Sequence, residues 1–212
     1  MIPIHEILHT IQGEGTRAGR PCVLIRTLGC NLDCTWCDTD QSDARGRDMQ
    51  VEQIVQSVVR TRCRLVEVTG GEPLLHEETP ALCSALQDAG LEVLVETNGS
   101  LDVGALPRGV VRIMDIKPPS SGEGGKFLAS NVGRLGSGDE VKMVVADRND
   151  YNWARERLTT ELAGFEGTCL LSPLTPGMDP GTLARWILED RLDVRLNLQT
   201  HKILFPDGEP RI

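Results

Sequence analysis

From Gly29 to Asp40 the chain reads Gly-Cys-Asn-Leu-Asp-Cys-Thr-Trp-Cys-Asp-Thr-Asp, which places three cysteines at the spacing C-x3-C-x2-C. A closed structural zinc site takes four ligands, and this stretch supplies three with no fourth nearby. A 4Fe-4S cluster normally takes four cysteines, so three cysteines would leave one iron free to bind another molecule. The stretch therefore predicts a cluster with an open iron, with an incomplete zinc site or chance cysteines as the alternatives.

Length and composition indicate a soluble globular protein. The 212 residues, of which 40% are hydrophobic and 25% charged, fit a single domain over residues 1–212. No apolar run is long enough to span a bilayer, and the first residues do not resemble a signal peptide. We therefore expect a cytoplasmic protein without a membrane segment.

Charge and cysteine content narrow the function classes. A net charge of −9 disfavours a protein that grips nucleic acid, so a small-molecule substrate is expected. Seven cysteines in a reducing compartment, three of them clustered, favour metal ligation over disulfides. Cys22, Cys63, Cys83 and Cys169 lie in apolar patterns and are expected in the core.

Strand and helix patterns alternate along the chain. Apolar runs predict strands at 21–28, 64–69, 91–96, 110–116, 140–145, 168–172 and 194–199. Apolar positions at helical spacing predict helices over 51–59 and 79–89, with two more opening near Asp150 and at Pro180. This alternation predicts an α/β fold with about six parallel strands, a partial TIM-like barrel too short for eight strands.

Polar residues recur where the predicted strands end. In barrels of this type the carboxyl ends of the strands face the site. The residues at these ends are the three cysteines, Thr69-Gly70-Gly71-Glu72, Glu96-Thr97-Asn98, Asp115-Ile116-Lys117, Ser172 and Gln199-Thr200-His201. Gly70 and Gly71 allow close backbone approach to a ligand and Glu72 offers a carboxylate for an ammonium group, although a plain tight turn is the alternative.

The cysteine spacing, with Trp36 directly before the last cysteine, resembles the radical S-adenosylmethionine (SAM) superfamily. In that superfamily the open iron chelates the amino and carboxylate groups of SAM. The Gly-Gly-Glu-Pro stretch one βα unit later resembles the superfamily's site for the methionine amino group. Together the two motifs favour an enzyme.

Other motifs narrow the resemblance to the 7-carboxy-7-deazaguanine synthase family. They are Gln12-Gly13-Glu14-Gly15, Cys37-Asp38-Thr39, Thr69-Gly70-Gly71-Glu72-Pro73, Glu96-Thr97-Asn98-Gly99 and Gln199-Thr200-His201-Lys202. The resemblance runs from His5 to His201. It implies conversion of 6-carboxy-5,6,7,8-tetrahydropterin to 7-carboxy-7-deazaguanine with loss of ammonia, in queuosine-type 7-deazapurine biosynthesis.

The resemblance also implies ligands and roles for individual residues. It implies that Cys30, Cys34 and Cys37 bind the cluster. It also implies that Thr39 binds a Mg2+ ion that bridges to the substrate carboxylate, with a helix-cap role for Thr39 as the alternative. It assigns SAM to Trp36, Cys37, Asp38, Gly71, Glu72, Asp115, Lys117 and Ser172. It assigns the pterin to Ile11, Gln12, Gly13, Glu14, Arg26, Thr69 and His201. Ile212 is added because the terminal carboxylate of some relatives folds into the pocket.

Several of these roles have structural alternatives. Trp36 also suits packing of the cysteine loop, and Asp115 with Lys117 also suits an ordinary strand-end ion pair. Glu96 is implied as a proton-transfer group near the reacting ring, with a strand-end glutamate paired with a lysine as the alternative. Asp115-Ile116-Lys117 also departs from the Ser-Pro-Lys of many family members.

The partners follow from the same resemblance. They are a pterin substrate, an electron donor such as flavodoxin or ferredoxin, and a second copy of the chain in a homodimer. Two other functions share the cysteine motif: an activase that plants a glycyl radical on a partner protein, and a non-enzymatic zinc or electron-transfer module. The activase would have no use for the Gln12 to Gly15 stretch or for Thr39.

Overall fold

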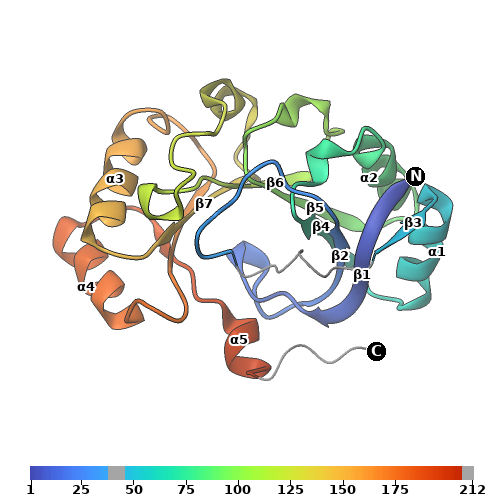
Figure 1. Ribbon diagram of the computed structural model, residues 1–212, viewed down its shortest axis with the longest axis horizontal. Coiled ribbons are helices and arrows are strands. Elements are labelled where there is room, and N and C mark those ends of the chain that lie inside the picture. The colour runs from blue at the N-terminus through green and yellow to red at the C-terminus, as the bar shows by residue number, and fades with distance from the viewer. Residues whose placement is uncertain (38–45, 207–212) are drawn as a thin grey trace.

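The apolar runs of the sequence pair into one curved sheet. The computed structural model describes residues 1–37 and 46–206, and within them the sheet has nine strands in the order β3-β1-β2-β4-β5-β6-β7-β8-β9. The strands are β1 (Ile2–Ile11), β2 (Pro21–Thr27), β3 (Arg47–Met49), β4 (Leu65–Gly70), β5 (Glu92–Thr97), β6 (Val111–Asp115), β7 (Glu140–Val145), β8 (Thr168–Pro173) and β9 (Arg195–Leu196). Figure 1 shows the curvature, with the helices outside it.

The strands from β2 onward, β3 apart, pair in parallel, which confirms the partial barrel. Six of them, β2 and β4 to β8, match the predicted runs to within one or two residues, and the two-residue β9 follows at the edge. The strands β1 and β3 pair antiparallel to their neighbours and lie at the opposite edge. The carboxyl ends of the parallel strands therefore share one rim of the barrel.

Strand β1 is the element that the sequence pattern obscured. Its pairing with β2 shifts register between Ile4 and Glu6, and such a bulge reverses which residues face each side. Ile2 and Ile4 consequently pack into the helix-covered core, whereas Leu8 packs on the opposite side of the sheet. Buried and less buried residues alternate regularly before the bulge and again after it, but the bulge shifts the period, so the segment as a whole shows a mixed pattern.

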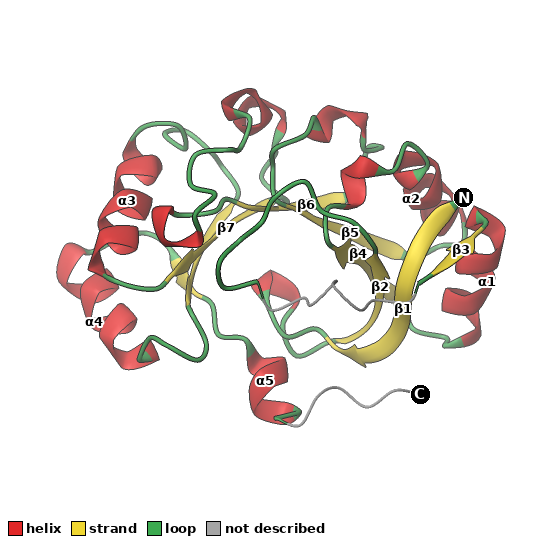
Figure 2. Cartoon of the chain, viewed as in Figure 1, coloured by secondary structure: helices red, strands yellow, loops and turns green. Residues whose placement is uncertain are grey.

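The helices cover the convex side of the sheet (Figure 2). They are α1 (Val51–Arg60), α2 (Thr79–Asp88), α3 (Arg148–Thr159) and α4 (Pro180–Asp190), whereas the short α5 (Thr200–Leu204) lies apart from them after β9. Helix α4 begins at Pro180 as predicted, with Asp179 as its N-cap, whereas α3 begins after Asp147, whose carboxylate accepts from the backbone N–H groups of Asn149 and Asp150. No helix within the described residues is long and apolar enough to cross a membrane.

Two apolar clusters join the helices to the sheet. One packs Val66, Val68 and their neighbours against Ile54 of α1 and Leu86 of α2. The other packs the outward residues of β7 and β8 against α3 and α4, including Tyr151 and Leu183. The four cysteines outside the Gly29 to Asp40 stretch belong to apolar clusters, with Cys22 and Cys83 buried and Cys63 and Cys169 half-buried.

The concave side carries a smaller apolar layer beneath its polar groups. Leu8, Leu24, Leu65, Leu94 and Ile113 fill the bottom of the barrel. Glu67, Thr69, Glu96, Asp115 and Lys142 follow them at alternate positions of β4 to β7. The inward side chains of β4, β5 and β6 therefore change from apolar to polar or charged toward the carboxyl rim, whereas β7 already begins with the buried Glu140.

Candidate active site

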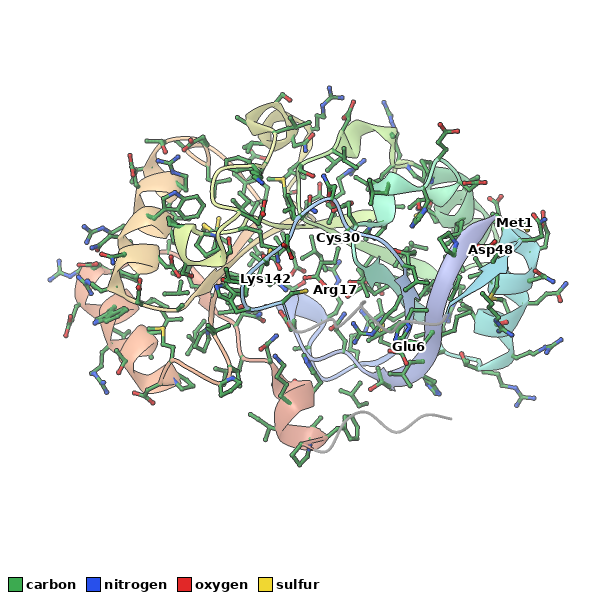
Figure 3. The ribbon with its side chains drawn as sticks, viewed as in Figure 1. Met1, Glu6, Arg17, Cys30, Asp48 and Lys142 are labelled. Carbon is green, nitrogen blue, oxygen red and sulfur yellow. The ribbon has the colours of Figure 1, made fainter. Side chains whose placement is uncertain are left out.

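The three cysteines lie on the loop that leaves the carboxyl end of β2. Cys30 and Cys37 are exposed and Cys34 is half-buried, and the backbone N–H of Cys37 donates to the Cys34 carbonyl over 3.1 Å. The loop starts at Gly29, whose φ of +88° favours glycine. In the view of Figure 3, Cys30 and Lys142 lie over the concave side of the sheet, whereas Met1 and Asp48 lie at its β3 end.

The residues after β6 clamp this loop. The Thr35 backbone N–H donates to the Ser121 carbonyl and its hydroxyl to the Ser120 carbonyl, both over 2.9 Å. The Trp36 ring N–H donates to the Ser120 hydroxyl over 3.1 Å, and that hydroxyl donates to the buried Asp150 at the start of α3. The turn at Pro119–Ser121, which follows β6, is thus packed on the cysteine loop.

The donor set suits an iron-sulfur cluster better than a single metal ion. No three His, Cys, Asp or Glu side chains in residues 1–37 and 46–206 converge closely enough to hold one ion. The thiols instead spread along an open loop, with no fourth cysteine beside them. Burial raises the pKa of Cys34 to about 11, opposed by the nearby Lys117 ammonium, so a metal centre must displace this proton to gain its thiolate.

The Gly-Gly-Glu-Pro turn lies directly under the loop. A Cβ on Gly70, whose φ is +122°, would lie 2.3 Å from the Thr27 carbonyl oxygen, so only glycine fits there. The Glu72 side chain is fully buried, and its carboxylate accepts from the N–H groups of Leu74 (2.9 Å) and Asn98 (2.7 Å) and from the Thr97 hydroxyl (2.8 Å).

This burial changes how Glu72 can act. Burial raises the pKa of Glu72, opposed by the hydrogen bonds that the carboxylate accepts. Because the carboxylate is buried and hydrogen-bonded to Thr97 and Asn98, it ties the turn to the end of β5. The atoms that this turn, Gly71 included, presents toward a ligand are therefore those of its backbone.

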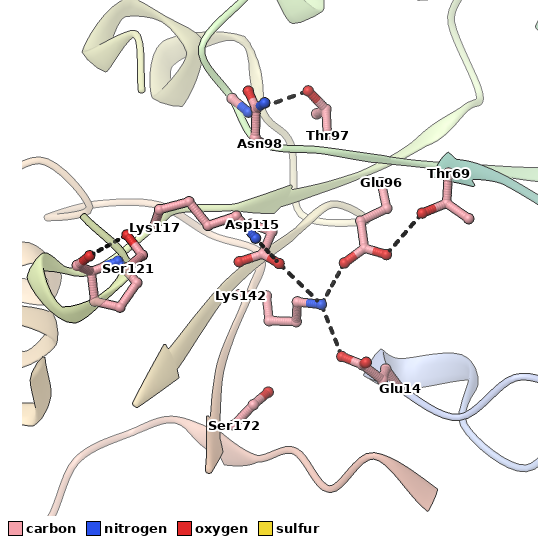
Figure 4. Close-up of polar contacts among 12 residues, drawn as sticks. Glu14, Thr69, Glu96, Thr97, Asn98, Asp115, Lys117, Ser121, Lys142 and Ser172 are labelled. Carbon is pink, nitrogen blue, oxygen red and sulfur yellow. Dashed lines mark hydrogen bonds and ion pairs between the residues drawn. The ribbon is translucent and has the colours of Figure 1, made fainter. Parts of the chain in front are cut away.

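A lysine inside the barrel connects three carboxylates (Figure 4). Lys142 Nζ lies 2.9 Å from Glu14 Oε2 and 3.2 Å from Asp115 Oδ2, and it donates to Glu96 as well. Burial by itself lowers the pKa of Lys142, but the three carboxylates outweigh burial and raise it well above its ordinary value. The ammonium is therefore permanently charged in the interior.

The carboxylates around Lys142 have further partners. Asp115 also pairs with Lys117 over 2.9 Å, and Thr69 donates to Glu96 over 3.2 Å. Burial tends to raise the pKa of Asp115, but Lys117 and Lys142 hold it below its ordinary value. Lys117 Nζ also lies 5.8 Å from the centre of the Trp36 ring, so the charge network reaches the cysteine loop.

The loop after β1 closes the opposite end of the barrel. Gln199 and Asn197 donate to the Glu14 carboxylate over 2.9 and 3.2 Å, and the pKa of Glu14, which burial tends to raise, is held below its ordinary value chiefly by Lys142. Gln12 donates to the buried Glu67, whose pKa is raised to about 8 by burial and then by the charge of Glu96. Glu67 is therefore protonated at neutral pH.

The other residues assigned to the pterin surround this loop. Ile11 ends β1, and Gly13 lies against the His201 ring, which leaves no room for a Cβ. Arg26 is paired with Glu6 over 3.0 Å and lies opposite Thr69 in the β2–β4 register. Ser172 accepts from Asn197 over 2.8 Å, which places this predicted SAM residue on the Glu14 side of the barrel.

The structure thus brings most of the assigned residues into two connected groups, one around the cysteine loop and one around Glu14. Asp38, Thr39 and Ile212 lie outside the described residues. Sequence reasoning missed Lys142 and Glu67. The available signal was a single charged residue inside each of two apolar strands, Val-Lys-Met and Val-Glu-Val.

Comparison with known proteins identifies the family. Residues 24–115 match the radical SAM superfamily. Two proteins named 7-carboxy-7-deazaguanine synthase, from Koribacter versatilis and Chlorobaculum tepidum, are each 41% identical to the chain, covering 95% and 97% of it and 96% and 95% of their own lengths. The chain belongs to the 7-carboxy-7-deazaguanine synthase family.

A solved structure supports the family fold. QueE from Escherichia coli superposes with a TM-score of 0.78 at 25% sequence identity, covering 93% of each chain. As a radical SAM enzyme of the 7-carboxy-7-deazaguanine synthase family, the chain uses a 4Fe-4S cluster and SAM. Of the three functions weighed from the sequence, the comparisons confirm the synthase.

Proposed function

We propose that the chain converts 6-carboxy-5,6,7,8-tetrahydropterin to 7-carboxy-7-deazaguanine with release of ammonia. The observation that carries this proposal is the connection, in a member of this family, between the three-cysteine loop and the buried acids around Lys142. This substrate carries ring N–H groups and a 6-carboxylate. The interior offers acids for the N–H groups and Arg26 for the carboxylate.

Cys30, Cys34 and Cys37 would hold the cluster, and the residues around the loop would orient SAM. When bound, the cluster and SAM supply one-electron cleavage of the sulfonium bond to a 5′-deoxyadenosyl radical. The turn at Gly71 and Glu72 presents backbone to the amino group, and Trp36, Cys37 and Asp38 border the adenine. Asp115 Oδ1 is buried without a hydrogen-bond partner among the described residues, which suits a donor from the SAM ribose.

The other interior group would hold the pterin. Arg26 pairs with its carboxylate, Glu14 and Thr69 bind ring positions, and Ile11 to Gly13 with His201 border the ring. Glu96 is the proposed proton-transfer group, since its carboxylate is held between Lys142 and Thr69. Ser172 remains a predicted SAM contact and Ile212 a predicted pterin contact.

The proposed magnesium site rests on the sequence resemblance. A hard cation prefers oxygen ligands, and the Thr39 hydroxyl is the proposed one. Thr39→Ala should weaken the Mg2+ dependence of product formation while SAM still binds, as checked by titrating Mg2+ at saturating SAM. An unchanged Mg2+ response would assign Thr39 a structural role.

The wider setting completes the proposal. Residues 1–212 form one radical SAM domain that acts in the cytoplasm as a homodimer and receives electrons from a flavodoxin or ferredoxin. No nucleic acid takes part, in keeping with the net charge of −9. The product enters 7-deazapurine biosynthesis of the queuosine type.

One incubation tests the proposal. Cluster-reconstituted protein is mixed anaerobically with reductant, SAM, Mg2+ and 6-carboxytetrahydropterin, and the small molecules are identified by mass spectrometry. Carboxydeazaguanine is the expected product. Formation of 5′-deoxyadenosine without it would overturn the substrate assignment and point to a radical SAM enzyme acting on something else, such as an activase.

A further inference from the structure

The lysine at the centre of the barrel is expensive to bury. Lys142 is about 5% exposed, and its ammonium is surrounded by Glu14, Glu96 and Asp115. Buried ion networks generally stabilise a fold no better than well-packed apolar side chains would. The outward positions on either side of it, Val141 and Met143, show that apolar residues suit this strand. A role beyond folding is therefore indicated for Lys142.

The contacts of Lys142 define what it can do. An ammonium group has three N–H donors, and Lys142 donates to Glu14 and Glu96 while Asp115 lies 3.2 Å away as an ion-pair partner. The charge of Lys142 is therefore directed at three acids of the protein. Its effect on a reaction must pass through the three acids that it holds.

Those three acids come from different parts of the site. Glu14 lies on the loop after β1 with the proposed pterin residues, and Asp115 ends β6 beside Lys117 and the cysteine loop. Glu96 ends β5 between them and also accepts from Thr69. Without a cation at their centre, the three carboxylates would repel one another and separate or take up protons.

We propose that Lys142 is a positioning residue that fixes the pterin-side Glu14 and the SAM-side Asp115 around Glu96, and so sets the placement of the two ligands relative to each other. This inference rests on the proposed function. Misplacement of reacting groups by about 1 Å is enough to cost on the order of a hundredfold in rate. Loss of Lys142 should therefore separate SAM cleavage from product formation.

The test compares Lys142→Met, which keeps the length and removes the charge, with Lys142→Arg, which keeps the charge in a longer planar group. Holoprotein is incubated anaerobically with reductant, SAM, Mg2+ and the tetrahydropterin, and 5′-deoxyadenosine and carboxydeazaguanine are both quantified. We expect the ratio of deoxyadenosine to product to rise at least about tenfold in Lys142→Met and about threefold in Lys142→Arg.

A binding measurement without reductant gives an independent readout. Equilibrium dialysis of holoprotein with 6-carboxypterin, an oxidised analogue that lacks the hydrogen to be removed, should show about tenfold weaker binding in Lys142→Met. SAM binding should change less than about threefold, since Asp115 keeps Lys117 as a partner. Lys126→Met, which removes an exposed lysine outside the network, is the matched control.

The outcomes separate this inference from the proposed function. A purely structural role would lower both products together, because a smaller folded fraction leaves their ratio unchanged. An unchanged ratio in Lys142→Arg, or in Lys142→Met where it folds, overturns the inference while the proposed function stands. If the wild-type protein makes no carboxydeazaguanine, the proposed function itself fails.

Discussion

The two sides of strands β4 and β7 differ although they are built from neighbouring residues. On the convex side Val66 and Val68 of β4 pack against α1 and α2. On the concave side Glu67 of β4 and Lys142 of β7 hold an acid-rich network. A period of two along each strand thus separates an apolar layer from a charged one.

This difference separates stability from chemistry. The convex side removes apolar area from water, which is the main favourable term in folding. The concave side buries charges at a cost that its ion pairs only partly offset. Substitutions on the convex side should therefore lower the free energy of unfolding, and substitutions on the concave side or its rim should mainly change ligand binding and turnover.

The largest effect on chemistry is expected from Cys34→Ala at the rim. Removing one of three thiolates should abolish the cluster absorbance and all SAM cleavage, while the convex packing keeps the fold. Absorbance spectra, deoxyadenosine assays and circular dichroism check this. Cys63→Ala, which removes a half-buried cysteine from the apolar packing of the convex side, should keep the iron-sulfur cluster. Activity in Cys34→Ala would contradict the cluster assignment.

The largest effect on stability is expected from Leu86→Ala on the convex side. Leu86 is fully buried between α2 and the sheet, and truncating such a leucine costs about 2–5 kcal/mol of unfolding free energy. Anaerobic urea unfolding measures this loss. Leu188→Ala on α4, a site that is 75% exposed, is the control. A folded Leu86→Ala protein that has lost turnover would break the separation between the two sides.

The convex side and the positions of the parallel strands along the chain could be predicted from the sequence because they depend on periodic apolar residues. The helix at Val51–Arg60 and the strand at Glu140–Val145 show this, since both have a regular apolar pattern. Strand β1 was not assigned, because its bulge breaks the period between Ile4 and Glu6. Strand β3 has three residues, which is too short for a pattern.

The site was predictable only where a motif fixes the spacing. The cysteines and the Gly70-Gly71-Glu72 turn are local motifs, and both lie where the strand ends were expected to be. The meeting of Glu14, Glu96, Asp115 and Lys142 depends on contacts between residues up to 128 positions apart. No local pattern carries that information, and the inward direction of the Glu72 carboxylate depends equally on Thr97 and Asn98 of another strand.

A smaller effect, and one that depends on pH, is expected from Glu67→Gln on the concave side. The folded protein keeps the Glu67 proton up to about pH 8, whereas the ordinary carboxyl value is 4.5. Between these values the folded state binds one more proton than the unfolded chain, so Glu67 lowers the free energy of unfolding as pH rises through this window. Glutamine removes this titration and can still accept from Gln12.

Urea unfolding at pH 5, 6.5 and 8 measures this effect. The stability of Glu67→Gln relative to the wild-type protein should increase with pH across this window. Glu189→Gln, which removes an exposed carboxylate on α4, is the control. If the difference in unfolding free energy between Glu67→Gln and the wild-type protein stays constant from pH 5 to 8, the pKa of Glu67 is not raised. The concave side would then not carry a buried neutral acid at this position.

The smallest effect is expected from Ser120→Ala, at the point where the rim meets the convex side. The Ser120 hydroxyl accepts from the Trp36 ring and donates to Asp150 of α3, so it connects the cysteine loop to a helix of the outer layer. Its loss leaves in place the hydrogen bonds that the Thr35 N–H and hydroxyl donate to backbone carbonyls, so we expect the contact between the loop and the outer layer to weaken by about 1 kcal/mol. The cluster should then be lost to a chelator a few times faster, as measured by the decay of its absorbance, whereas Ser84→Ala on α2 should leave that rate unchanged. An unchanged decay rate in Ser120→Ala would mean that the two layers act independently and that the two hydrogen bonds donated by Thr35 hold the loop.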